Sequence, residues 1–303
     1  MKRDFLYFAD LPPADVLPLL ERAIALKKGE RSSALSGKSV VLMFEKPSLR
    51  TKLSFWVGTE KLGGRPVYFG PEEVGLGKRE PVADVAKVIS RMVDIAVIRT
   101  FAQSTLDQFA AAASIPVVNA LSDAEHPCQA LADLMTILEH RGSLKGATVA
   151  YIGDGNNIAV SLAQAVAATG GRFVIASPEG YELPVNIARR ARSLGAEMGG
   201  EVELITHPRE AVADADIVYT DVWTSMGQEA ETQARLEAFK GYQVNPRLLD
   251  AAGPQVKFMH DLPAHPGEEV STGLLDDPRS IVFDQAENRL WAQAALLETL
   301  ANV

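Results

Sequence analysis

Short apolar runs alternate with segments of helical spacing along almost the whole chain, and this alternation restricts the fold more than any other feature. Residues 39–44, 95–99 and 148–152 are typical of buried strands, whereas apolar residues recur at helical spacing between positions 13 and 28. Further strands are expected at 66–69, 116–119, 172–176, 203–205, 217–219 and 257–260, and further helices near 53, at 84–92, from 127 to about 140 and from 157. Strands separated by helices require right-handed crossovers, so we expect an α/β protein with two doubly wound domains and central parallel sheets.

A polar stretch at residues 141–146 separates two such alternating halves. Since 303 residues are enough for two domains, we expect one domain at 1–140 and a second at 141–283.

The last segment, residues 284–303, again has apolar residues at helical spacing. It opens with Asp284 followed three residues later by Glu287, which is the pattern of a capping box. We therefore expect a C-terminal helix of about four turns.

Composition and charge exclude several classes of function. The formal net charge of −9 disfavours binding to nucleic acid or to an acidic membrane, so an anionic ligand would need a local cluster of positive charge. The single cysteine, Cys128, excludes an internal disulfide and suits a reducing cytoplasm. We expect no signal peptide and no membrane span, because no stretch has the apolar length that either requires.

Ser48, Arg50 and Thr51 follow the first expected strand and precede a helix. The first turn of a helix offers unpaired backbone N–H groups and the positive end of the dipole, and here hydroxyls and a guanidinium are added. This combination is suited to phosphate. The alternative is that Ser48 only caps the helix and that Arg50 is a solvated charge.

His126 directly precedes Pro127, a residue favoured at the first position of a helix. The positive end of the dipole would keep the imidazole neutral, and a neutral imidazole can donate a hydrogen bond to a carbonyl. The alternative is a capping histidine. Cys128 has no acid or base partner nearby, so we interpret it as a small buried side chain.

Gly153-Asp154-Gly155 follows a strand and partly matches a dinucleotide fingerprint, but Ile158 occupies the third glycine position. The neighbouring asparagines, Asn156 and Asn157, suit a small zwitterion better, because amides can meet both a carboxylate and an ammonium group. A nicotinamide-dependent dehydrogenase therefore stays open as an alternative.

Two further loops follow strands and carry polar groups. Asp221 could bind an ammonium group, and Ser225 and Met226 lie on a glycine-containing loop that could close over a ligand. His260 and Asp261 follow the last strand. Taken alone, either loop could be ordinary surface structure.

Together these segments resemble the ornithine and aspartate carbamoyltransferase family. The similarity covers almost the whole chain in the family's order, through residues 48–51, 98–101, 126–129, 153–157, 221–227, 260–263 and 284–289. The loop Ser225-Met226-Gly227 is similar to the ornithine branch, because aspartate carbamoyltransferases lack it. The resemblance implies transfer of a carbamoyl group from carbamoyl phosphate to the side-chain amine of L-ornithine, giving L-citrulline and phosphate.

The resemblance also implies site residues by position. The carbamoyl phosphate ligands would be Ser48, Leu49, Arg50, Thr51, Arg99, His126, Gln129, Leu262 and Arg289, and the ornithine ligands Asn157, Asp221, Ser225 and Met226. Arg50, Arg99, His126 and Asp261 would take part in catalysis. Residues 1–140 would then bind carbamoyl phosphate and residues 141–283 ornithine, and residues 284–303, which carry Arg289, would return to the first domain.

Three departures from the family pattern concern the site. Leu49 and Lys52 stand where the family usually has Thr and Arg, although the backbone N–H of Leu49 remains available. Asp261 replaces a cysteine beside the attacking amine; a carboxylate there favours the ammonium form, but could equally accept the proton. Gly75 matches the position from which a neighbouring subunit often reaches the phosphate, so that contact is either absent or made by Lys78 or Arg79.

The mechanism implied by the family needs no metal, cofactor or covalent intermediate, and the scattered histidines lack the spacing of metal ligands. Family members are trimers or assemblies of trimers, so we expect a homotrimer in the cytoplasm, without a nucleic-acid or membrane partner. The alternatives are a carbamoyltransferase for another acceptor, such as putrescine, N-acetylornithine or aspartate, and a catalytically silent member that binds metabolites and regulates a partner.

Overall fold

The computed structural model describes residues 3–302, and these residues divide into two compact units. The first unit contains residues up to Met135 together with the segment from Glu287 onward, and the second contains Thr136–Ala286. Both divisions fall inside helices, namely α6 (Pro127–Arg141) and α12 (Val282–Ala301). None of the described helices is long and apolar enough to cross a membrane.

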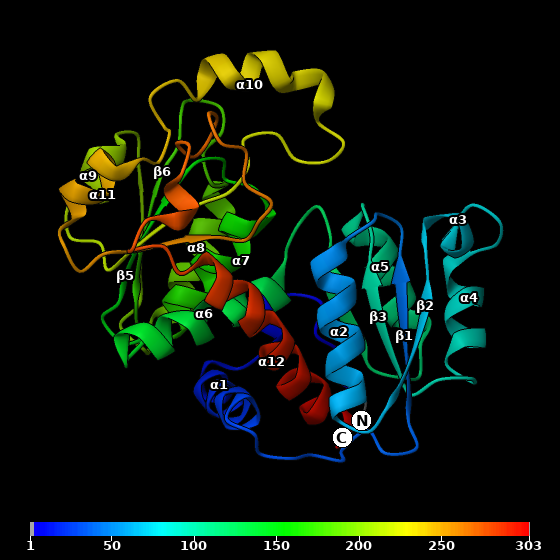
Figure 1. Cartoon of the computed structure of the whole chain (residues 1–303). Helices are drawn as coiled ribbons and strands as arrows, with labels where there is room; N and C mark the ends of the chain where they lie inside the picture. The colour runs from blue at the N-terminus through cyan, green and yellow to red at the C-terminus, as the bar shows by residue number, and fades with distance from the viewer. Residues whose placement is uncertain (1–2, 303) are drawn as a thin grey trace. The chain divides into compact units, whose positions relative to one another are not determined.

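The first unit is built on a four-stranded parallel sheet with the order β2-β1-β3-β4 (Figure 1). The strands are β1 (Ser39–Phe44), β2 (Arg65–Phe69), β3 (Ile95–Arg99) and β4 (Val117–Leu121). Its other helices are α1 (Pro13–Lys27), α2 (Leu49–Lys61), α3 (Pro71–Val74), α4 (Val82–Ile89) and α5 (Gln103–Ala112), and a 3₁₀ turn spans Phe8–Asp10.

Helices cover both faces of this sheet. Val41 and Met43 of β1 pack in one apolar cluster with Leu106 and Phe109 of α5 and with residues of α4. On α2, a Cβ built at Gly58 would lie 3.5 Å from Leu290 of α12, so these two helices pack closely. The C-terminal helix therefore returns to the first unit from Glu287 onward, as expected.

The second unit contains a five-stranded parallel sheet with the order β7-β6-β5-β8-β9. The strands are β5 (Thr148–Ile152), β6 (Arg172–Ala176), β7 (Glu201–Ile205), β8 (Ile217–Thr220) and β9 (Lys257–His260). The helices are α7 (Asn157–Ala168), α8 (Val185–Gly195), α9 (Pro208–Ala211), α10 (Thr232–Ala238) and α11 (Pro246–Ala252), with 3₁₀ turns at Glu229–Glu231 and Leu274–Asp276. The expected class of two doubly wound parallel-sheet domains is confirmed.

Each sheet has one point where the order of the strands reverses, between β1 and β3 in the first and between β5 and β8 in the second. In open parallel sheets, ligands bind at such a point, beyond the carboxyl ends of the two strands. The motifs at Ser48 and Arg99 follow one pair of strands, and those at Gly153 and Asp221 follow the other.

Local structure differs from expectation in two respects. Helix α12 begins at Val282, so Asp284 lies within its first turn, and the predicted capping box is wrong. Asp284 instead places Oδ2 2.9 Å from Nε2 of His140. Helices α3, α5 and α8 to α11 were not anticipated. Helix α8 buries mainly alanines, which weaken the periodic signal, and α3 and α9 are only four residues long.

Candidate active site

Ser48 caps α2 directly beyond β1. Its backbone is extended, and its Oγ accepts a hydrogen bond from the N–H of Thr51 at 3.3 Å, as an N-cap side chain does. Arg50 lies in the first turn, and its buried Nε has no hydrogen-bond partner among the described residues. The Leu49 side chain is exposed, so only its backbone is suited to binding a ligand here.

Arg99 ends β3 beside this helix start. It pairs in register with Phe44 of β1, and its carbonyl accepts from the N–H of Glu45 at 2.8 Å, so the ends of β1 and β3 are held together. Arg289 of α12 donates from Nη2 to Oγ1 of Thr51, which brings a second guanidinium to the first turn of α2. Arg99 and Arg289 are both buried, in a region rich in hydrogen-bond donors and positive charge.

His126 lies immediately before α6 and is almost fully buried. Burial holds the pKa of His126 well below its usual value, and the positive charges of Arg289, Arg99 and Lys46 lower it further. The ring is therefore neutral near neutral pH, as expected, but desolvation is the main cause rather than the helix dipole.

One turn into α6, the amide of Gln129 is also buried. Its Nε2 donates to Oδ1 of Asp133 at 2.9 Å, while its Oε1 accepts no hydrogen bond among the described residues. Cys128 is buried between these positions, and its thiol contacts the carbonyl of Asn119. Burial raises the pKa of the Cys128 thiol and keeps it protonated, in agreement with a packing role.

In the second unit, Asp221 follows β8 and is fixed by groups on both sides of the strand reversal. Its Oδ2 accepts from Nδ2 of Asn156 at 2.8 Å, and its Oδ1 accepts from the N–H of Val222 at 2.7 Å. Asn156 also caps α7, because its Oδ1 accepts from the N–H groups of Ile158 and Ala159. Asn157, the predicted ligand, is the first residue of this helix.

Ser225 and Met226 belong to the loop between β8 and α10, where the Met226 side chain is exposed. Arg235 of α10 is buried and anchors the base of this loop: its Nη1 donates to the Trp223 carbonyl at 3.0 Å and to Oδ2 of Asp154 at 2.6 Å. Since Asp154 follows β5, Arg235 links the loop to the other side of the strand reversal.

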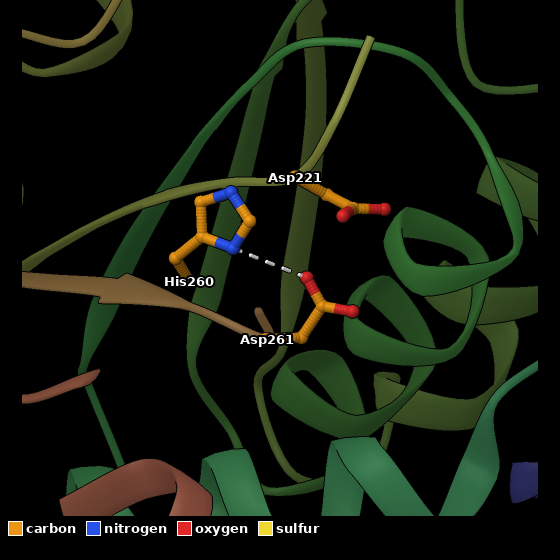
Figure 2. A group of neighbouring side chains, drawn as sticks. All are labelled: Asp221, His260 and Asp261. Carbon is orange, nitrogen blue, oxygen red and sulfur yellow. Dashed lines mark ion pairs between the residues drawn. The ribbon is translucent and has the colours of Figure 1, made fainter. Parts of the chain in front are cut away.

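His260 ends β9 and Asp261 follows it, close to Asp221 (Figure 2). Nδ1 of His260 accepts from the N–H of Leu262 at 2.9 Å, so the ring proton resides on Nε2, which donates to Oε1 of the buried Glu269 at 3.1 Å. Leu262 has a φ of 61°, an unusual conformation for a residue with a side chain.

Asp221, His260 and Asp261 each present a potential metal-ligand atom, and these atoms lie within 4.8 Å of one another. A metal would need a ring nitrogen with a free lone pair, but Nδ1 already accepts the Leu262 N–H and Nε2 carries the proton that binds Glu269. The group is therefore better described as two carboxylates beside a histidine of fixed orientation.

The geometry around Gly155 argues against a dinucleotide. A Cβ placed there would lie 2.4 Å from the backbone nitrogen of Leu183 and 2.5 Å from the carbonyl carbon of Glu182. The N–H of Gly155 donates to the Tyr181 carbonyl at 2.8 Å. The glycine thus accommodates the chain's own backbone, in the place where a pyrophosphate would have to approach.

The structure brings some of the predicted residues together within each unit: Thr51, Arg99, His126 and Arg289 in the first, and Asp221 and Asp261 in the second. Ser48, Arg50, Thr51, Arg99, His126, Gln129 and Arg289 belong to the first unit, and Asn157, Asp221, Ser225, Met226, Asp261 and Leu262 to the second. Sequence reasoning gave no role to two residues beside them. Lys46 stands two positions before a predicted ligand, which was the available signal, whereas no signal marked Arg235.

Nearly the whole chain is similar to proteins of known family. Residues 3–139 match the carbamoyl-P binding domain of aspartate/ornithine carbamoyltransferases, and residues 145–300 match their Asp/Orn binding domain. An ornithine carbamoyltransferase of Parafrankia sp. is 51% identical over 98% of this chain and 96% of its own, and an anabolic one of Pseudomonas aeruginosa is 49% identical over 98% and 97%. The solved ornithine carbamoyltransferase of Pyrococcus furiosus has a TM-score of 0.94 and 46% identity, covering 98% of this chain and 96% of that one. With both family domains matched in order, and with the fold and the polar groups at the strand reversals in agreement, the chain belongs to the aspartate/ornithine carbamoyltransferase family.

Proposed function

We propose that this protein is an ornithine carbamoyltransferase, which transfers the carbamoyl group of carbamoyl phosphate to the side-chain amine of L-ornithine and releases L-citrulline and phosphate. The structural observation that carries this proposal is the first turn of α2, where the guanidinium of Arg289 binds Thr51 and the buried Nε of Arg50 has no hydrogen-bond partner within residues 3–302. The ornithine carbamoyltransferases with about half of their residues identical support ornithine as the acceptor over putrescine, N-acetylornithine or aspartate.

The phosphate of the donor binds at the start of α2. Backbone N–H groups from Ser48 to Arg50, the hydroxyl of Ser48 and the guanidinium of Arg50 supply its hydrogen bonds, and the dipole of α2 favours its negative charge. Arg99 and Arg289 add positive charge that burial protects from screening by solvent.

The carbamoyl group is recognised by hydrogen-bonding groups of the first unit. His126 donates to the carbonyl oxygen together with Thr51 and Arg99, and negative charge grows on that oxygen in the transition state. A neutral imidazole suits this role, because it donates a proton in a hydrogen bond without giving it up. Oε1 of Gln129, which lacks a donor, accepts from the carbamoyl NH₂.

Ornithine is held by the second unit. Asp221 binds an ammonium group with the carboxylate that Asn156 and the Val222 N–H fix in place. Asn157, Ser225 and Met226 bind the rest of the amino acid. We assign this unit as the ornithine-binding domain and the first unit as the carbamoyl phosphate-binding domain.

The chemical step joins the two substrates directly. The deprotonated side-chain amine attacks the carbonyl carbon, a C–N bond forms, and the C–O bond to phosphate breaks with both electrons leaving on phosphate. The nitrogen then releases one proton, which the departing phosphate or the Asp261 carboxylate accepts. We assign Asp261 a place beside this nitrogen, with Leu262 near the carbamoyl group. The transfer involves no change of oxidation state, and holding two reactants in orientation supplies much of the rate.

We further propose that the enzyme works in arginine biosynthesis in the cytoplasm as a homotrimer or a multiple of trimers. The anabolic relative of P. aeruginosa supports the pathway. At the family's position for a contact from the neighbouring subunit stands Gly75, with a left-handed φ of 46°, and Arg79 lies alongside it. Arg79 or Lys78 is the residue we assign to that contact.

The assignment is tested with Arg50→Ala. Citrulline formation from carbamoyl phosphate and ornithine should fall by about 100-fold or more, because Arg50 contributes charge-assisted hydrogen bonds to the donor. Arg65→Ala removes an exposed arginine of the same unit and should leave turnover unchanged. Full turnover in Arg50→Ala would refute the role of Arg50, and a product formed only with another amine of a panel would refute ornithine.

A further inference from the structure

A second group of potential metal ligands lies on the turn that follows β9, and the reaction described above does not use it. His265, Glu268 and Glu269 each offer one ligand atom, a ring nitrogen or a carboxylate oxygen, and these three atoms lie within 4.8 Å of one another. All three residues belong to the second unit. Zinc binds such atoms at about 2.0–2.2 Å, so modest side-chain rotations are enough to close the group around one ion.

The backbone of the turn holds the three residues in place. The N–H of Glu268 donates to the His265 carbonyl at 3.0 Å, which closes the turn. The N–H of Val244 donates to the Glu269 carbonyl at 2.8 Å, and Nε2 of Gln243 donates to the Glu268 carbonyl at 2.9 Å. The turn is therefore attached to the segment before α11, and its side chains start from fixed positions.

Glu269 is fully buried, and its two carboxylate oxygens have different surroundings. Oε1 accepts hydrogen bonds from Nε2 of His260 at 3.1 Å and from the N–H of His265 at 2.5 Å. Oε2 is also buried, but it has no hydrogen-bond partner within residues 3–302. A buried carboxylate oxygen without a donor costs free energy. A cation bound by this carboxylate would remove that cost.

The imidazole of His265 is available as a ligand, unlike that of His260. Within the described part of the chain, neither ring nitrogen of His265 makes a hydrogen bond, and Nδ1 lies 3.8 Å from Oε2 of Glu268, which is too far for one. His260 uses both of its ring nitrogens, for Leu262 and for Glu269. The side chains of His265 and Glu268 are 47% and 36% exposed, so an ion can reach them from solvent.

We propose that His265, Glu268 and Glu269 form a binding site for one zinc ion. An imidazole nitrogen and carboxylate oxygens are ligands that zinc accepts, and three protein ligands leave the fourth tetrahedral position to water. His260 orients Glu269 from the side opposite the ion, as partners of metal ligands commonly do. Because Asp261 follows His260, the bound ion stabilises the segment that carries Asp261 without taking part in the transfer.

Zinc binding to the full chain, first treated with a chelator, is the direct test. Competition between the protein and a chromogenic chelator for added zinc chloride should give one ion per chain. His265→Asn removes the imidazole from an exposed position, so the fold should persist, which circular dichroism verifies. The affinity for zinc should fall by about 100-fold or more, since loss of an outer partner of a metal ligand alone costs about 10–100-fold. Unchanged stoichiometry and affinity in His265→Asn would overturn the proposal.

His207→Asn is the matched control. His207 is an exposed histidine of the same unit at the start of α9, outside the group, and its replacement should leave the affinity for zinc unchanged. An equal loss in both variants would show binding to scattered surface histidines and would overturn the site. Calcium, which prefers oxygen ligands, should bind much more weakly than zinc. Equal affinity for the two ions would show only an acidic surface and would also overturn it.

Two structural measurements locate the ion. Diffraction from zinc-soaked crystals at the zinc absorption edge should give an anomalous peak among His265, Glu268 and Glu269, whereas a peak only between Asp221 and Asp261 would refute the assignment. Added zinc should slow hydrogen exchange of the turn at 265–269 in the unsubstituted protein and not in His265→Asn, because the ion binds the folded turn alone. Equal slowing in both proteins would contradict the site. None of these outcomes depends on whether citrulline is formed.

Discussion

Replacing Asp261 by asparagine tests how two neighbouring carboxylates affect the protonation of the attacking amine. Oxygens of Asp221 and Asp261 lie within 4.8 Å of each other, so an ammonium group bound by Asp221 also feels the charge of Asp261. The amine must lose a proton before it can attack, whereas negative charge stabilises the protonated form. Asp261→Asn should therefore lower the pKa of the bound amine.

The size of the effect follows from Coulomb's law. For a nitrogen about 5 Å from the Asp261 carboxylate, the interaction is about 0.8 kcal/mol at a dielectric constant of 80 and about 3.3 kcal/mol at 20. Since one pKa unit corresponds to about 1.36 kcal/mol, the rising limb of the plot of kcat against pH should move about 0.6 to 2.4 pH units toward lower pH.

The assay is citrulline formation from pH 6 to 10 at saturating concentrations of both substrates. Glu268→Gln removes a carboxylate of the same segment and serves as the matched control, for which we expect no movement of the profile. If Asp261 is instead the proton acceptor, Asp261→Asn lowers turnover at every pH and leaves the limb in place. An unmoved limb at full turnover would refute any placement of Asp261 beside the amine.

Three further substitutions test other parts of the structure. Arg235→Met leaves the buried Asp154 carboxylate without its partner, and breaking such an ion pair costs about 3–5 kcal/mol. Hydrogen exchange of the loop after Trp223 should therefore become faster, and the KM for ornithine should rise. Unchanged hydrogen exchange would contradict the anchoring role of Arg235. Gly155→Ala must displace the backbone 2.4 Å away and should lower the melting temperature far more than Gly70→Ala, whose new methyl group would make only ordinary contacts from 3.5 Å outward. Equal effects would argue against the packing described. The pKa of His126 is lowered in the folded protein, so its contribution to stability is present above pH 6.5 and is lost as the pH falls toward that lowered pKa. The free energy of unfolding of His126→Gln should therefore depend less on pH in acid. Urea titrations between pH 5 and 7 measure this dependence.

Much of the fold was predictable because its signals are local. The strands at Ser39–Phe44, Ile95–Arg99 and Thr148–Ile152 were placed from continuous apolar runs, and α7 from its start after the asparagine pair. The capping box at Asp284 was wrong, because the same pattern also fits a helix that begins two residues earlier. Helix α8 was not predicted, because its buried residues are alanines and a glycine, and these give little periodic contrast in hydrophobicity.

The candidate site was predictable to the extent that its groups follow strand ends. The sequence alone identified Ser48, Arg50 and His126 as candidates, since a helix start has a local signature. It could not predict why His126 stays neutral, because the burial responsible comes from the packing of distant segments. Nor could it reveal that Arg235 binds Asp154, a partner 81 positions away.

The order of the strands, the family and the chemical types in the site were thus determined by the sequence, because apolar runs and short motifs act over a few residues. Tertiary structure alone decided which strand ends become neighbours, and hence where the guanidinium groups and the fixed Asp221 lie. The physical reason is that burial and Coulomb interactions depend on distance in space, and that distance is set by strand pairing between segments far apart in the chain.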